Sequence, residues 1–285
     1  MQINNNYILN RCPLCSSRGI TQIGKLKYRE HINFSSHDVE LSQEPELWKC
    51  HTCLSSFVQN TVDAETAKML YSTGHPGNRW SKVAFDQNKT REVVKHMSAI
   101  FQDKCNVLDV GCNTGELLDF ARILGCRTSG VEFSSASCDV LREKGHTPYA
   151  TLDDTPGNYD VITAFDLIEH IYDVPEFIKR CSDKLSAKGR LVILTGNINS
   201  LSARLAGVHW WYAQYPEHIV FPSKKYFKKR SGLRVEKWIL TYASKSYKFP
   251  INIIWPAILH TFLLRQAFTG LPSIGPDHAL IILKK

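Results

Sequence analysis

The stretch Val107-Leu108-Asp109-Val110-Gly111-Cys112-Asn113-Thr114-Gly115-Glu116-Leu117-Leu118 decides the fold of this chain. An apolar run ends beside an acid, passes two glycines and continues into a pattern with helical period, which predicts a strand, a tight turn and a helix. The glycines are spaced G-x-x-x-G rather than the G-x-G-x-x-G of pyrophosphate binders. A glycine turn lets backbone approach a ligand closely, and the free N–H groups of a helix start favour a carboxylate. The stretch therefore predicts a ligand site.

The rest of the chain from residue 106 alternates strand and helix patterns, which predicts a mostly parallel sheet covered on both faces. Strands are expected at 106–110, 127–132, near 150, and at 159–165, 185–195, 233–241 and 278–284, with helices at 115–124 and 135–144. Further helices are expected at 64–70, 85–101 and 224–230.

An acid closes the second predicted strand. Glu132 lies 21 residues after Gly111, close to the distance at which an acid reaches the ribose hydroxyls in nucleotide-binding folds. Phe165 and Asp166 end a later strand, and ligands of open α/β sheets bind at such carboxyl ends. These positions predict that the ligand carries a ribose.

The glycine stretch resembles motif I of class I S-adenosylmethionine (SAM)-dependent methyltransferases. Asp166-Leu167-Ile168-Glu169-His170-Ile171 and Leu185-Ser186-Ala187-Lys188-Gly189 also resemble that family, although Ala187 and Lys188 depart from its usual L-x-P-G-G. The resemblance spans about 105–195 and implies a Rossmann-like α/β fold with a seven-stranded sheet, and SAM as cofactor. It implies contacts with SAM by Asp109, Gly111, Cys112, Asn113, Thr114, Gly115, Glu132, Phe133, Thr151, Leu152, Phe165 and Asp166. For Glu169 and His170 we expect helix capping and packing rather than catalysis.

Two C-x-x-C pairs precede this domain. They are Cys12 with Cys15 and Cys50 with Cys53, 34 residues apart, and together they match a zinc ribbon. Four thiolates complete a tetrahedral site and leave no position for substrate, so we expect a structural Zn2+. Four free thiols or one redox-active pair are the alternatives, and His51 is expected to be a bystander. The other five cysteines are scattered singly, which fits a reducing cytoplasm.

The candidate acceptor site follows the fifth strand. Here an aromatic run, Trp210-Trp211-Tyr212, precedes Tyr215, Glu217 and His218. This Tyr-x-Glu-His arrangement resembles that of deoxysugar C-methyltransferases, which also carry a zinc-binding head, and short polysaccharide and natural-product methyltransferases carry the same Pro-Glu-His signature. The resemblance implies that the three residues line the acceptor pocket and that His218 is the general base. The alternative is that Glu217 and His218 only fix a loop.

These patterns divide the chain into a zinc-ribbon head (1–60), a helical linker that covers the cofactor (61–104) and a SAM-binding methyltransferase domain (105–285). Substrate-side insertions are expected at about 198–230 and 245–277. The apolar segment 249–271 is interrupted by prolines and charges, so we expect no membrane span, although 250–271 is a candidate for peripheral membrane contact and 256–268 for a lid or buried helix.

The sequence thus predicts a cytoplasmic SAM-dependent methyltransferase that acts on a sugar or sugar-containing precursor, at oxygen or carbon. The net charge of +8 leaves a zinc-headed rRNA base methyltransferase as one alternative, but the basic cluster at 224–230 is better explained as a solvated helix face. A non-catalytic zinc-ribbon adaptor with a degenerate methyltransferase fold is the other alternative. The oligomeric state is not predicted.

Overall fold

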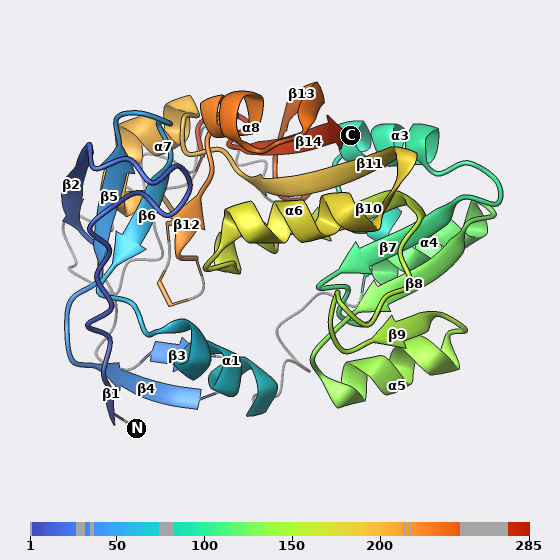
Figure 1. Cartoon of the computed structure of the whole chain (residues 1–285), viewed down its shortest axis with the longest axis horizontal. Helices are drawn as coiled ribbons and strands as arrows, with labels where there is room; N and C mark the ends of the chain where they lie inside the picture. The colour runs from blue at the N-terminus through green and yellow to red at the C-terminus, as the bar shows by residue number, and fades with distance from the viewer. Residues whose placement is uncertain are drawn as a thin grey trace.

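A computed structural model describes residues 2–26, 32–34, 37–73, 83–213, 215–216, 218–245 and 273–285. Figure 1 shows two parts side by side: a large sheet with its helices on the right, and the N-terminal segments on the left. Glu217, Gln214 and the segments 74–82 and 246–272 lie outside the described residues, so the predictions for 250–271 and for a helix at 256–268 fall there.

The large sheet has seven strands. In sheet order they are β13 (Arg234–Thr241), β14 (His278–Lys284), β11 (Leu185–Gly196), β10 (Tyr159–Phe165), β7 (Asn106–Val110), β8 (Arg127–Val131) and β9 (Thr147–Tyr149). The strands from β11 to β9 run parallel, whereas β14 is antiparallel to both β11 and β13. This order confirms the predicted Rossmann-like sheet, with all seven predicted strands present.

The central strands are buried because helices cover the sheet. The apolar residues of β7, and those of β10 up to Ala164, are buried, as expected for parallel strands covered on both faces. In Figure 1, α6 (Val174–Lys184) crosses the near side of β10 and β11. It buries Val174, Phe177, Ile178 and Cys181, a spacing that places them on one helical face. The helices α4 (Glu116–Ile123) and α5 (Ser135–Glu143) follow β7 and β8, within one residue of the predicted ends.

The single helix predicted at 85–101 is wrong. The chain forms α2 (Phe85–Asn88) and α3 (Arg91–Ile100), and Lys89 and Thr90 between them are extended. Both side chains are used elsewhere: Lys89 Nζ lies 2.8 Å from Asp166 Oδ2, and the Thr90 hydroxyl lies 2.6 Å from that of Thr241. These contacts with the methyltransferase sheet explain the break, which a local helical pattern does not contain.

The N-terminal part contains two small sheets. One joins β1 (Gln2–Ile3), β4 (His37–Leu41) and β3 (Ile32–Phe34), and packs against α1 (Ala64–Thr73). The other has the order β12-β6-β5-β2, with β2 (Ile20–Lys25), β5 (Glu46–Cys50) and β6 (Ser56–Gln59) from the head.

The fourth strand of that sheet, β12 (Val220–Phe221), comes from the predicted insertion at 198–230. Ile219 just before it connects the two parts: its carbonyl accepts the Val58 N–H at 2.8 Å, and its own N–H donates to the Glu169 carbonyl at 2.8 Å. The head sheet is therefore completed by the same loop that carries His218. The short helices α7 (Leu201–Ala206) and α8 (Lys224–Arg230) flank this loop.

Among the described residues, none of the helices has both the length and the apolar character needed to cross a bilayer.

Candidate functional site

The glycine turn joins β7 to α4. Gly111, Asn113 and Gly115 all have positive φ, at 73°, 49° and 84°, a region that favours glycine and tolerates asparagine. A Cβ on Gly115 would also lie 2.6 Å from Leu141 Cδ2, so a side chain there would require Leu141 of α5 to move. The turn leaves the N-terminus of α4 at the carboxyl edge of the sheet.

Glu132 faces this turn from the end of β8. Its carboxylate accepts the Asn113 N–H at 3.0 Å and the Ser134 N–H at 2.9 Å, one on each oxygen. A carboxylate oxygen has a second lone pair, so each one retains capacity for a hydroxyl donor. The neighbouring Phe133 is 62% exposed and presents an uncovered aromatic ring beside the acid. The predicted ribose acid and the predicted turn thus lie together.

Asp109 and Cys112 are buried and support the turn from within the protein. Asp109 Oδ1 accepts the Thr163 hydroxyl at 2.6 Å, and burial raises the pKa of Asp109 to about 7. Cys112 packs against Gly130 so closely that a Cβ there would lie 2.3 Å from its Sγ. The side chains of Asp109 and Cys112 therefore contact other residues of the protein.

Thr114, Thr151 and Leu152, the other predicted cofactor residues near the turn, make local contacts. The Thr114 hydroxyl donates to Glu116 at 2.5 Å. The Thr151 N–H and hydroxyl donate to Asp154, at 3.0 and 2.7 Å, and Leu152 is buried. The loop after β9 is therefore held in one conformation by its own residues.

The carboxyl end of β10 carries a charged pair. Asp166 has φ of 49°, and its Oδ2 lies 2.8 Å from Lys89 Nζ. Burial alone raises the pKa of Asp166, but the Lys89 and His278 charges outweigh it and lower the pKa on balance. Asp166 Oδ1 is buried without a hydrogen-bond partner among the described residues. Phe165 beside it packs 6.0 Å from Phe85 of α2, between ring centroids.

The sequence does not indicate a role for Lys89, because the local pattern places it in the middle of a helix. No local signal marks it, since its partner Asp166 is 77 residues away in the chain.

His218 lies against a buried acid that is not its sequence neighbour. Its Nδ1–H donates to the Tyr212 carbonyl at 2.6 Å, which leaves Nε2 as the unprotonated nitrogen of the neutral ring. That Nε2 lies 4.0 Å from Glu169 Oε1. Glu169 is fully buried, accepts the Tyr212 hydroxyl on Oε1 and accepts the Thr195 hydroxyl on Oε2 at 2.8 Å. Burial raises the pKa of Glu169, and the positive charge of a protonated His218 opposes this.

Glu169 and Tyr212 therefore surround His218, although the sequence favoured Glu217 and Tyr215. Between ring centroids, Tyr212 lies 4.2 Å and His170 lies 5.0 Å from His218. Tyr215 is buried and its hydroxyl accepts the Val62 N–H at 2.9 Å, so this side chain holds the linker rather than the imidazole. Glu217 lies outside the described residues.

The aromatic run is anchored to the start of β14. The indole N–H groups of Trp210 and Trp211 both donate to Asp277 Oδ2, at 3.0 and 2.7 Å. Trp211 also stacks on His278 at 5.6 Å between centroids. These contacts fix the loop that presents Tyr212 and His218.

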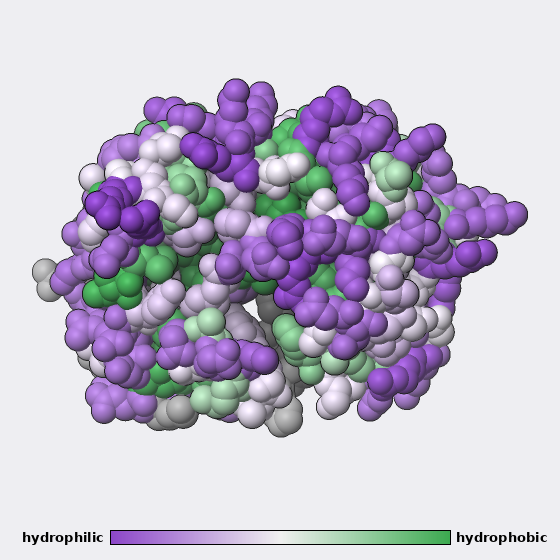
Figure 2. Space-filling model, viewed as in Figure 1, coloured by the Kyte–Doolittle hydropathy of each residue, from purple (hydrophilic) through white to green (hydrophobic). Residues whose placement is uncertain are grey.

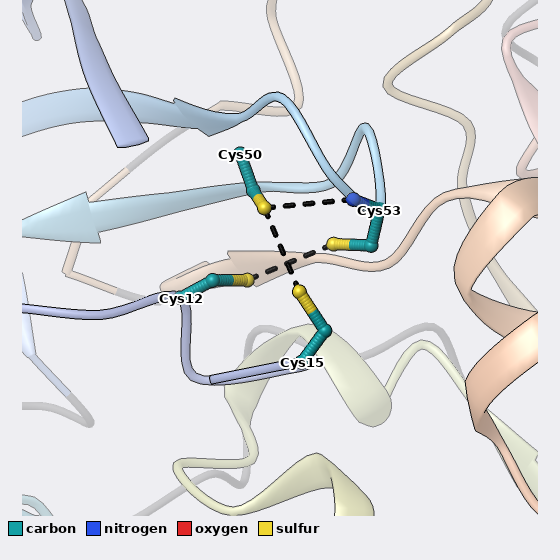
Figure 3. Close-up of side chains that lie close together, drawn as sticks. All are labelled: Cys12, Cys15, Cys50 and Cys53. Atoms are coloured by element: carbon teal, nitrogen blue, oxygen red, sulfur yellow. Dashed lines mark hydrogen bonds between the residues drawn. The ribbon is translucent and has the colours of Figure 1, made fainter. Parts of the chain in front are cut away.

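The four cysteines of the head converge from their two knuckles (Figure 3). Cys12 Sγ lies 3.6 Å from Cys53 Sγ, and Cys15 Sγ lies 3.6 Å from Cys50 Sγ. All four sulfurs lie within 4.8 Å of one another. Zn–S bonds of about 2.3 Å in a tetrahedron give S···S edges of about 3.8 Å, so the cluster fits this geometry. His51 contacts the Thr21 hydroxyl at 2.9 Å and does not belong to the cluster, as expected.

Comparison with known proteins identifies a methyltransferase domain. A family model described as a methyltransferase domain matches residues 83–235. An ubiquinone biosynthesis O-methyltransferase of Bradyrhizobium diazoefficiens is 30% identical over 109 residues, which cover 35% of this chain and 43% of that relative. One of Idiomarina loihiensis is 30% identical over 118 residues, covering 38% and 48%. The chain thus spans less than half the length of these curated relatives.

Among solved structures, a SAM-dependent methyltransferase from Archaeoglobus fulgidus aligns with a TM-score of 0.48 and 20% identity. The alignment covers 69% of this chain and 95% of that one.

Proposed function

Since the chain belongs to the methyltransferase-domain family, we propose that it binds SAM at the carboxyl edge of β7, β8 and β10 and transfers the methyl group to an acceptor held near His218. One observation carries the proposal: this single edge brings together the glycine turn, Glu132 and Asp166, although they are far apart in the sequence, and Asp166 Oδ1 has no hydrogen-bond partner among the described residues. SAM supplies an activated sulfonium methyl, so the protein has to position the reactants and accept a proton.

The residues at this edge match the groups of SAM. Glu132 offers lone pairs to the two ribose hydroxyls, and the exposed Phe133 ring offers a face to adenine. The N–H groups at the start of α4 suit the methionyl carboxylate, and Asp166 Oδ1 suits the ammonium group. Lys89 holds Asp166 in place from α2.

We assign His218 Nε2 as the atom that accepts the proton from the methyl acceptor. The Tyr212 carbonyl fixes the ring tautomer, so Nε2 carries the lone pair that a general base needs. Glu169 stabilises the imidazolium that forms after proton transfer, and Tyr212 and Thr195 orient its carboxylate. We assign Glu169 and Tyr212 as positioning residues for His218, and Tyr215 as the residue that holds the linker through Val62.

The acceptor class is proposed from the sequence resemblance: a hydroxyl of a sugar or sugar-containing precursor, with carbon methylation as the alternative. The curated relatives are named as O-methyltransferases, which supports oxygen as the acceptor atom. We further propose that the four head cysteines hold a structural Zn2+, which the sulfur geometry and the pairing of two knuckles support.

The test is calorimetry with SAM followed by turnover of methyl-labelled SAM with nucleotide sugars, phenols and an rRNA fragment as separate acceptors. SAM binding combined with labelling of a nucleotide sugar supports the full proposal. Labelling of only the phenol or only the rRNA fragment overturns the acceptor class, and absence of SAM binding overturns the enzyme and favours a non-catalytic adaptor.

The site residue to test first is Glu132. We expect Glu132→Gln to weaken SAM binding by about tenfold or more, because a charged acceptor of the ribose hydroxyls is lost. Glu143→Gln, an exposed acid on α5, is the matched control and leaves the affinity unchanged. Equal SAM affinities for both variants would remove Glu132 from the site.

A further inference from the structure

One face of the molecule combines exposed apolar side chains with lysines. On α7, Leu201 is 62% exposed and Leu205 is 69% exposed, and Leu54 and Ile274 beside them are also exposed. Ile274 is joined to α7, since its N–H donates to the Ser202 hydroxyl at 3.1 Å, and Leu54 is joined to Asn199 by its carbonyl. Four of the exposed large apolar residues therefore gather around one short helix, and we call this surface the α7–α8 face.

The same face carries a groove of about 520 Å³ between the head and the two helices. Its described lining consists of Lys49, Leu54, Asn199, Arg204, Lys224, Lys225, Lys228 and Lys229. Six of these residues are cationic and none is acidic. Purple, hydrophilic atoms cover α8 at the top of the view in Figure 2. The surface thus has a strongly positive potential next to exposed leucines.

The inner sides of both helices fix this arrangement. α8 buries Tyr226 and Phe227, which turns its lysines outward, and Ser223 caps its first turn by accepting the Tyr226 N–H at 3.0 Å. α7 buries Ser202 and Ala203, which turns Leu201 and Leu205 outward. The α7–α8 face is therefore a property of two docked helices rather than of mobile side chains alone.

We propose that the α7–α8 face is a peripheral docking surface for an anionic lipid bilayer. Exposed leucines enter the boundary between head groups and acyl chains, and the surrounding lysines bind lipid phosphates, a combination typical of interfacial membrane binding. A nucleic acid would use the same charge but would gain little from leucines. A single strand is usually held by stacking on aromatic rings, and none lies in the described lining of the groove.

The position of this face relates it to the acceptor site. α7 leads into the loop that carries Tyr212 and His218, and α8 begins three residues after Phe221, which ends that loop. Docking of α7 and α8 would therefore hold both ends of the His218 loop at the bilayer, where an acceptor attached to a lipid is presented. Membrane binding by this face does not depend on methyl transfer, so the two proposals fail separately.

The experiment is co-sedimentation of the full chain with vesicles of phosphatidylcholine alone and of phosphatidylcholine with 30% phosphatidylglycerol. We expect binding to the anionic vesicles that is lost in 0.5 M NaCl. The variant Lys225→Gln/Lys228→Gln/Lys229→Gln should bind about a hundredfold more weakly, given the usual contribution of each lysine near an anionic surface. Leu201→Ser/Leu205→Ser should bind at least about tenfold more weakly.

The matched control is Lys95→Gln/Arg127→Gln/Lys188→Gln, which removes the same charge from exposed positions outside the face. It should bind like the parent protein, and unchanged melting temperatures show that all variants fold. Equal binding by the face variants and the control, or equal binding to both kinds of vesicle, overturns the proposal. Binding of single-stranded RNA that needs the lysines but not the leucines, without vesicle binding, also overturns it and assigns the face to nucleic acid.

Discussion

Asp109 shows how a single buried carboxyl group supports the cofactor turn. It lies in the middle of the sheet, its carboxylate accepts the Thr163 hydroxyl at 2.6 Å, and burial raises its pKa from the usual 3.8 to about 7. Because its pKa is higher in the folded state, the folded protein binds the proton more tightly than the unfolded chain. The stability that this proton provides is complete below about pH 4 and is lost as the pH rises through about 7.

We therefore expect Asp109→Asn to gain stability relative to the parent protein as the pH rises from 4 to 8. The difference in unfolding free energy should change by up to about 4 kcal/mol, as three pKa units imply. Urea unfolding of both proteins at several pH values measures it. Parallel stability curves would show that Asp109 has an ordinary pKa in the folded state.

Glu169 is the residue for which the role that we propose differs most from the role expected from the sequence. The sequence favoured capping and packing, but the carboxylate lies beside His218 and accepts two hydroxyl hydrogen bonds. The sequence around Glu169 does not reveal these contacts, because Tyr212 and His218 are more than 40 residues away in the chain.

We expect His218→Asn to lower kcat by about a hundredfold or more, as loss of a general base does. Glu169→Gln should lower kcat by about tenfold with an unchanged Kd for SAM, because it acts through the imidazole. Steady-state kinetics and calorimetry separate the two effects. Glu176→Gln, an exposed acid on α6, is the control. If Glu169→Gln weakened SAM binding instead, the acid would belong to the cofactor site.

At the scale of elements, the contact of β8 with the glycine turn fixes the cofactor edge. Gly130 of β8 leaves just enough room for Cys112, and a Cβ there would meet the sulfur at 2.3 Å and Leu118 at 3.1 Å. Cys112 and Leu118 are both buried and the Cys112 Cβ would itself lie 3.3 Å away, so the turn would have to move.

We expect Gly130→Ala to cost about 1–3 kcal/mol of stability, the usual cost of overpacking a core. It should also weaken SAM binding, because the displaced turn carries Asn113 and Gly115. The double variant Gly130→Ala/Cys112→Ala should recover part of both losses by removing the sulfur. Thermal unfolding and calorimetry provide the two measurements, and a double variant no better than Gly130→Ala would contradict this account.

At the scale of the whole molecule, the head and the methyltransferase domain share a strand and a loop. β12 completes the head sheet, and Ile219 hydrogen-bonds both Val58 of the head and Glu169 of the site. The cysteine cluster lies in the same apolar core as Trp210, Tyr212 and Phe221. Hydrogen bonds and packing therefore connect the head directly to the loop that carries His218.

Removal of the proposed Zn2+ by a chelator, or Cys15→Ser, should lower the melting temperature by at least about 5 °C. It should also lower kcat more than SAM affinity, because β7, β8 and β10 belong to the seven-stranded sheet, whereas Cys50 ends a strand of the head sheet. Metal analysis, thermal unfolding and calorimetry test this, with Cys105→Ser as the control for loss of one thiol. A metal-free protein that keeps its melting temperature would exclude a structural ion.

The sequence by itself determined the cofactor domain, because its features are local. A strand, a glycine turn and a helix start occupy twelve consecutive residues, and period and turn chemistry are set by neighbours in the chain. The sequence also predicts the two knuckles, because each C-x-x-C pair is complete within four residues.

Only the tertiary structure decided what faces His218, where the helix at 85–101 breaks and which strand completes the head sheet. The partners involved, such as Lys89 with Asp166 and Glu169 with His218, are separated by tens of residues in the chain. Their contacts form when the sheet and its insertions pack together, and side-chain hydrogen bonds formed in that packing outweigh local propensity.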